Sequence, residues 1–174
     1  MQEVSINKQA HLSEHLTSSS VATLGHSSEL DGSRLSPHFT LGELCKTSAK
    51  TQDGNIPSRV HIENLKRVCQ WLERLRCKRN EPIIINSGYR SEAVNKAVGG
   101  VPTSNHTTGC AVDIHVTGIE QLIRYAATLL DISDERQEEF DELLLERSPK
   151  GTYWLHFAVR PKNNRMRIQL CDRT

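Results

Sequence analysis

The sequence predicts an α+β domain in which helices flank an antiparallel sheet. Apolar residues recur at helical spacing over residues 65–75 and again over residues 119–130, which predicts two long helices. Near the carboxyl end, residues 153–159 and 166–170 alternate between apolar and polar side chains with a period of two. Turn residues over 161–164 separate these two strands, so we expect them to pair in the sheet that carries the chemistry.

The first predicted helices follow from capping signals. Thr40 and Glu43 have capping-box spacing, which predicts the start of a short helix. Pro57 fits the first turn of the main core helix, whose apolar face includes residues 65–75. The β-branched run at residues 83–86 then predicts a short strand buried on both faces.

The middle of the chain continues with alternating short elements. Ser91 is placed to cap a brief helix that stops at Gly99–Gly100. A strand is expected over residues 111–116 and a helix over residues 119–130. The acidic stretch at residues 131–139 is expected to be a loop.

Composition and charge exclude several classes of protein. The chain has 174 residues, 36% of them hydrophobic, which is enough for one core of ordinary size. Lys and Arg number 22 against 21 Asp and Glu, so a protein that coats nucleic acid through bulk positive charge is not expected. No apolar stretch reaches the roughly 18 residues that span a bilayer, and no basic start followed by an apolar run marks a secretion signal. We expect a monomer made in the cytoplasm, with no nucleic-acid or membrane partner.

The amino-terminal segment differs from the rest of the chain. Residues 1–36 contain nine serines, three histidines and few large apolar residues, with no sustained helical or strand period. We therefore predict a flexible Ser-rich tail over residues 1–36 and one folded domain over residues 37–174.

Three polar residues stand out as candidate metal ligands. His106 precedes Asp113 by seven residues, and Asp113 alternates with apolar neighbours on its predicted strand. His156 alternates in the same way, so both side chains point away from the core if their neighbours point into it. Two imidazoles and one carboxylate from separate segments suit a zinc ion that keeps its fourth position for water. Taken singly, the three residues fit a loop histidine, a turn acceptor and a hydrogen-bonded sheet residue more readily than metal ligands.

Four motifs decide between these interpretations: SxHxxGxAxD at 104–113, SGYRS at 87–91, Asn95 with Val98–Gly100, and a late Trp-x-His at 154–156. Together they resemble peptidase family M15, the zinc-dependent D-Ala-D-Ala carboxypeptidases. The likeness runs from about Phe39 to Val159 and is greatest to the branch of short phage-associated or bacterial wall-peptidase domains. It implies a hedgehog/DD-peptidase-like zinc domain.

The resemblance also implies roles for individual residues. His106, Asp113 and His156 take the positions of the ligands of Zn²⁺. Arg90 takes the position of the arginine that polarises the scissile carbonyl or holds a substrate carboxylate; alone, it also fits an ion pair with Glu92. We further assign Ser104, Tyr89 and Trp154 to substrate binding.

The catalytic base is the point at which the chain departs from many relatives. They carry an acid three residues before the last histidine ligand, where this chain has Tyr153, and no Asp or Glu occurs between Arg147 and Cys171. Other members, and the related hedgehog domains, have a glutamate at the end of the preceding strand. Glu146 ends the run 140–145 that resembles this strand, and a longer turn over 148–151 accounts for its spacing. We predict Glu146 as the base, with Glu142 and Asp141 as the next candidates.

From Arg147 to the end, the chain is strongly basic, with seven Lys or Arg, Arg147 included, against Asp172 alone. We interpret this excess as a solvated, charged edge strand that resists aggregation, although such an edge would also suit an anionic cell-wall polymer.

Three functions follow from the residues and the resemblance. The first is a zinc metallopeptidase that cleaves peptidoglycan stem peptides, as a D,D-carboxypeptidase or an endopeptidase, reaching the wall after release from the cell as phage endolysins do. The second is a binding module that keeps the zinc site without catalysis, and the third is a cytoplasmic dipeptidase for free D-Ala-D-Ala. Retention of Glu146 and Arg90 favours an enzyme, because a structural zinc needs neither.

Overall fold

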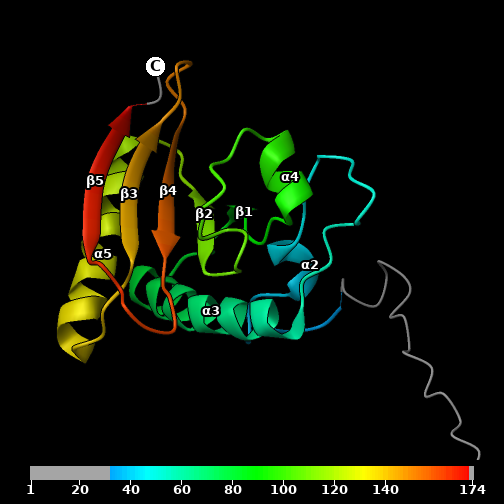
Figure 1. Cartoon of the computed structure of the whole chain (residues 1–174). Helices are drawn as coiled ribbons and strands as arrows, with labels where there is room; N and C mark the ends of the chain where they lie inside the picture. The colour runs from blue at the N-terminus through cyan, green and yellow to red at the C-terminus, as the bar shows by residue number, and fades with distance from the viewer. Residues whose placement is uncertain (1–31, 173–174) are drawn as a thin grey trace, which may run out of the picture.

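The computed structural model describes residues 32–172, and it confirms the predicted α+β class with helices around one five-stranded sheet (Figure 1). In chain order the elements are α2 (Leu41–Leu44), α3 (Arg59–Arg79), β1 (Ile85–Ser87), α4 (Glu92–Ala97), β2 (Ala111–His115), α5 (Ile119–Arg136), β3 (Glu142–Arg147), β4 (Tyr153–Ala158) and β5 (Arg167–Asp172).

The helix starts depend on the capping residues seen in the sequence. Thr40 Oγ1 accepts a hydrogen bond from the backbone N–H of Glu43 at the start of α2. Ser91 Oγ accepts one from Val94 at the start of α4. Helix α3 is capped by Ser58, so Pro57 precedes the cap instead of lying in the first turn as predicted. A proline there fixes an extended approach to the helix.

The sheet has the strand order β1-β2-β4-β3-β5, and it is mixed where a fully antiparallel sheet was predicted. Strand β5 pairs in parallel with β3 and forms no hairpin with β4. The expected hairpin was therefore wrong. Residues 159–166 carry the chain past the start of β3, where Met166 and Arg167 donate backbone hydrogen bonds to the carbonyls of Phe140 and Asp141.

Two other elements differ from the prediction. Helix α5 continues through the expected acidic loop to Arg136, because Ile132 and Ser133 extend its buried face while the acidic side chains lie on the exposed face. Strand β1 lies at an edge of the sheet, and the side chain of Ile84 just before it is exposed, so burial on both faces was also wrong.

Helices α3 and α5 pack against each other and cover one face of the sheet, α3 over β2 and α5 over β3 and β4. Figure 1 shows α2 and α4 beside β1, at the end of the sheet away from β5. On the helix-covered face, the strands contribute core side chains that alternate with polar ones: Val112, Ile114, Leu143, Leu155 and Phe157. The polar side chains of β2, β3 and β4 therefore project from the opposite face.

The segment just before the predicted domain start contacts the folded part. Ser33 accepts a backbone hydrogen bond from Leu41, and Leu35 packs against the core. Ser36 Oγ donates to Glu73 at 2.6 Å. Residues 1–31 of the predicted tail lie outside the described residues.

Within residues 32–172, no helix combines the length and the apolar character needed to cross a membrane.

Candidate active site

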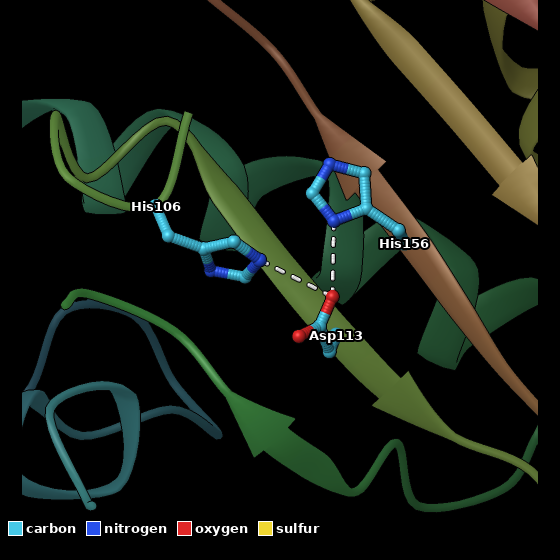
Figure 2. A group of neighbouring side chains, drawn as sticks. All are labelled: His106, Asp113 and His156. Carbon is cyan, nitrogen blue, oxygen red and sulfur yellow. Dashed lines mark hydrogen bonds and ion pairs between the residues drawn. The ribbon is translucent and has the colours of Figure 1, made fainter. Parts of the chain in front are cut away.

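Three side chains converge on the face of the sheet opposite α3 and α5. Asp113 on β2 pairs directly with His156 on β4 in the antiparallel register, and His106 lies in the loop that leads into β2. Figure 2 shows both imidazoles pointing to the same oxygen of Asp113. Asp113 Oδ1 lies 3.2 Å from His106 Nε2 and 2.9 Å from His156 Nδ1. The structure thus brings together all three ligands predicted from the sequence.

The second nitrogen of each imidazole also faces an acceptor. His106 Nδ1 lies 2.7 Å from the carbonyl oxygen of Gly88. His156 Nε2 lies 3.5 Å from Glu142 Oε2. Hydrogen bonds of this kind fix which ring nitrogen is left to bind a metal.

Burial and charge together set the protonation of this cluster. Burial would raise the pKa of Asp113, but His106 and His156 beside it hold that pKa well below its usual range. Burial would likewise lower the pKa of His156, but hydrogen bonds to Asp113 and Glu142 raise it to about 9. A carboxylate and a cationic imidazole therefore face each other in the metal-free site.

Arg90 reaches the same cluster from the SGYRS motif between β1 and α4. Its Nη2 lies 2.5 Å from Asp113 Oδ2, and its Nε donates to Ser87 Oγ at 2.7 Å. Gly88 allows this turn to pack closely, since a side-chain carbon there would lie 2.2 Å from the Leu44 carbonyl oxygen. That carbonyl accepts the backbone N–H of Tyr89, so α2 anchors the motif.

The loop that carries His106 is held just as tightly. Ser104 Oγ accepts the backbone N–H of His106, and the loop ends at Gly109, whose φ is +71°. A side-chain carbon at Gly109 would lie 2.6 Å from the carbonyl oxygen of His61 on α3. The glycine of the motif is thus required both by its backbone conformation and by its close contact with α3.

A cleft of about 540 Å³ opens above the cluster. Its lining includes residues from the loop after α4, from all strands except β1, and from the segment before β5: Arg90, Val98, Gly99, Gly100, Val101, Thr103, Ser104, Asn105, His106, Asp113, Glu142, Leu144, Glu146, Trp154, His156, Arg165, Arg167 and Cys171. Of the residues assigned to substrate binding, Ser104 and Trp154 line this cleft.

The structure does not bring Tyr89 into the cleft. Its side chain is buried in the core, and its ring stacks on His61 with 4.9 Å between ring centroids. Tyr89 therefore packs behind the SGYRS turn, and the structure does not bring it together with Ser104 and Trp154.

The three candidate bases occupy different environments. Glu146 on β3 lies opposite Trp154 and lines the cleft on the same face as His156. Glu142 also lines the cleft, whereas Asp141 is fully buried and is bound by Arg160 and Arg165. Asp141 is thus held away from the cleft, which leaves Glu146 and Glu142.

Sequence reasoning missed the residues that hold these acids. Asn105 Nδ2 donates to both Asp141 and Glu142, at 2.7 and 2.9 Å. Arg165 and Arg167, interpreted from the sequence as part of a solvated edge, lie 2.9 and 3.1 Å from Glu142 Oε1. The excess of basic residues near the carboxyl end was the available signal that they pair with acids elsewhere. The acids that Arg165 and Arg167 bind lie more than 20 residues earlier in the chain.

The donor set fits a zinc ion. Among residues 32–172, one group of side chains could hold a metal ion: His106, Asp113 and His156. One donor atom from each lies within 4.8 Å of the other two. Two imidazole nitrogens and one carboxylate oxygen match the ligands of a catalytic zinc site, and all three side chains are largely buried.

Comparison with known families agrees with this geometry. The model of the family described as Peptidase M15 matches residues 37–140, more than half of the chain. The chain belongs to peptidase family M15. The matched segment includes Arg90, His106 and Asp113, whereas Glu146 and His156 lie beyond its end. The structure brings these two residues to the same face as Asp113, because β4 pairs with β2 and β3 pairs with β4. No curated protein matches the chain at a significant level.

Proposed function

We propose that this M15 peptidase is a zinc-dependent enzyme that hydrolyses peptide bonds in the stem peptides of peptidoglycan. The observation that carries the proposal is the convergence of His106, Asp113 and His156 in a cleft that Arg90 and Glu146 also line. The choice of substrate is supported by the resemblance of the motifs to the wall-peptidase branch of the family.

The residues that line the cleft have separate roles in the proposed reaction. His106, Asp113 and His156 hold the zinc ion through the donor atoms that already converge. When bound, zinc lowers the pKa of a water molecule from about 15.7 toward about 7 and polarises the scissile carbonyl. Glu146 accepts the proton of the attacking water and returns it to the leaving amine, a role typically worth about 10²- to 10⁴-fold in rate.

Arg90 supplies positive charge beside the reacting carbonyl. Ser87 and Asp113 engage its Nε and Nη2, which fixes the plane of the guanidinium. Nη1 then serves the developing oxyanion or a terminal carboxylate of the substrate. A fixed donor of this kind requires no rearrangement during the reaction.

The non-catalytic alternative, a zinc-containing binding module, explains less of the cleft. A structural zinc needs neither a carboxylate such as Glu146 nor an arginine such as Arg90 beside an open ligand position. Both side chains line the cleft with the metal ligands. We therefore favour the enzyme.

Incubation of purified protein with muropeptides tests the proposal, with products identified by mass. Three samples are compared: zinc-loaded protein, protein treated with a chelator, and treated protein to which zinc is returned. We expect cleavage in the first and third samples alone. Loss of one terminal residue identifies a carboxypeptidase, and an internal cut identifies an endopeptidase.

A parallel sample with free D-Ala-D-Ala distinguishes the cytoplasmic dipeptidase. Cleavage of the dipeptide without cleavage of any stem peptide would replace the proposed substrate. Stoichiometric zinc with no cleavage of either substrate would favour the binding module.

A further inference from the structure

Glu142 lies beside His156. Of the two candidate histidine ligands, His156 has a side chain next to the ring nitrogen that points away from Asp113, whereas His106 has a backbone carbonyl there. His156 directs Nδ1 to Asp113 at 2.9 Å and Nε2 to Glu142 Oε2 at 3.5 Å. The imidazole is therefore bracketed by two carboxylates, one on each side of the ring. If Nδ1 binds the metal, Nε2 carries the proton and Glu142 is its acceptor.

The position of Glu142 is itself fixed by several donors. Its Oε2 accepts from Asn105 Nδ2 at 2.9 Å, and its Oε1 pairs with Arg165 and Arg167 at 2.9 and 3.1 Å. Asn105 lies in the loop before β2, Arg165 lies just before β5, and Arg167 begins β5. The Glu142 side chain is only 11% exposed. A carboxylate held in this way cannot turn from His156 toward another group in the cleft without breaking its ion pairs.

Glu146 provides a direct contrast on the same strand. Strand register places Glu142 and Glu146 on one face of β3, on either side of Leu144, which pairs with His156. Both acids are thus diagonal neighbours of the same histidine. Glu142 lies opposite Arg167 on β5, and both Arg165 and Arg167 form ion pairs with it. Glu146 instead lies between Trp154 on β4 and Cys171 on β5.

We propose that Glu142 is a positioning residue for the metal centre: it accepts the Nε2 proton of His156 and thereby presents Nδ1 to the zinc ion. Asn105, Arg165 and Arg167 hold the carboxylate in place for this task. The inference rests on the zinc site of the proposed function. It assigns the two acids of β3 to different tasks, Glu142 to ligand orientation and Glu146 to proton transfer.

Zinc affinity, measured by competition with a chromophoric chelator, tests this assignment. Glu142→Ala should weaken zinc binding by about 10- to 100-fold, the usual effect of removing the carboxylate partner of a ligating histidine. Glu142→Gln should weaken it less, because the amide oxygen still accepts one N–H. Glu146→Ala, the same change on the same face of the strand, is the matched control and should leave the affinity unchanged.

Activity at increasing zinc concentration separates positioning from proton transfer. Excess zinc should restore most of the turnover of Glu142→Ala, whereas it should not restore Glu146→Gln. Wild-type affinity in Glu142→Ala would overturn the inference. Equally, loss of turnover in zinc-saturated Glu142→Ala would make Glu142 a participant in the chemistry instead of a positioning residue.

Nitrogen-15 NMR of histidine in the zinc-loaded wild type gives a test that does not depend on the folding of a variant. We expect His156 to be metal-bound through Nδ1 and to carry a slowly exchanging Nε2 proton with a downfield shift. A metal-bound Nε2 would refute the inference while leaving the zinc site intact. Absence of bound zinc from the wild type would instead refute the proposed cofactor.

Discussion

Asp113 and His156 lie directly opposite each other on β2 and β4, and Asp113 Oδ1 is 2.9 Å from His156 Nδ1. Apolar neighbours on both strands, Val112 beside Asp113 and Phe157 beside His156, are buried on the other face. Because side chains alternate along a strand, a register shift of one residue would move either ligand to the helix-covered face. The hydrophobic core thus fixes the geometry of the metal site.

Replacing a ligand tests the site itself. His106→Ala and His156→Ala should each sharply reduce the zinc content of purified protein, because two remaining ligands hold the ion weakly. The measurement is metal analysis after dialysis, with His115→Ala as control, since His115 is exposed at the end of β2. Stoichiometric zinc in either ligand variant would rule out the assigned site.

Replacing the proposed base tests the chemistry. Glu146→Gln should keep its fold and its zinc but lose about 10²-fold or more in turnover, because an amide cannot carry the proton. Tyr153→Phe is the control and should cost far less. Tyr153 is adjacent to Trp154 on β4 and packs against the core, so its side chain lies on the face away from the cleft.

Near-wild-type turnover in Glu146→Gln together with a large loss in Glu142→Gln at saturating zinc would move the proton-transfer role to Glu142. The enzyme assignment would survive this result.

The metal-free protein should become less stable as the pH rises from about 6.5 to about 9. The folded chain raises the pKa of His156 to about 9, from the ordinary value of 6.5. A group that binds its proton more tightly in the folded state stabilises that state fully below the unfolded pKa and loses the effect through the folded pKa. Urea midpoints of zinc-free protein across this range measure the effect.

The same proton competes with zinc for His156. Zinc binding at pH 7 should therefore release a proton, and zinc affinity should fall as the pH is lowered from about 9. Calorimetry in buffers of different ionisation enthalpy counts the released protons. An affinity that stayed constant between pH 9 and pH 7 would contradict the raised pKa.

Replacing Asp141 should lower the stability of the fold more than it affects the catalytic reaction itself. It is fully buried and pairs with Arg160 and Arg165. Asp141→Ala therefore leaves Arg160 without this carboxylate, while Arg165 keeps its second partner, Glu142. Both guanidinium groups are partly exposed and can be solvated, so we expect the free energy of unfolding to fall by about 1–3 kcal/mol, the usual effect of losing hydrogen bonds to a charged group. Glu120→Ala, which removes an exposed pair with Arg124 on α5, is the control and should cost well under about 1 kcal/mol. Chemical denaturation compares the two.

Truncation tests the boundary between tail and domain. Deletion of residues 1–31 should leave the melting temperature nearly unchanged, because this serine-rich sequence has few apolar groups to bury. Deletion of residues 1–36 should lower it, since Leu35 packs on the core and Ser36 binds Glu73. Equal melting temperatures for the two truncations would show that these contacts contribute nothing.

Local sequence signals were enough to predict the starts of α2 and α4 and the face of the sheet on which Asp113 and His156 lie, whereas the resemblance to family M15 singled out these two residues and His106 as ligands. The caps at Thr40 and Ser91 depend on residues within one turn, and the alternation around Asp113 and His156 depends on immediate neighbours. Both kinds of signal act over a few residues, so one sequence contains all the information that they require.

The parallel pairing of β5 with β3 had no such signal. Turn residues before Arg165 suggested a hairpin, but the placement of β5 is fixed by backbone and arginine contacts with Asp141 and Glu142, more than 20 residues earlier. Tyr89 is a different case: membership of a recognisable motif suggested a substrate contact, whereas its side chain is buried in the core and does not line the cleft. Long-range partners and burial are properties of the folded chain, and periodicity does not report them.

The two imidazoles of the site differ in whether a mutation can remove the group that orients them. The orienting partner of His106 is the main-chain oxygen of Gly88, which every amino acid at that position would still carry. The orienting partner of His156 is the side chain of Glu142, which a single codon change removes or replaces. Selection for another metal, or for looser or tighter retention of one, therefore has an adjustable element at residue 142 and a constant one at residue 88.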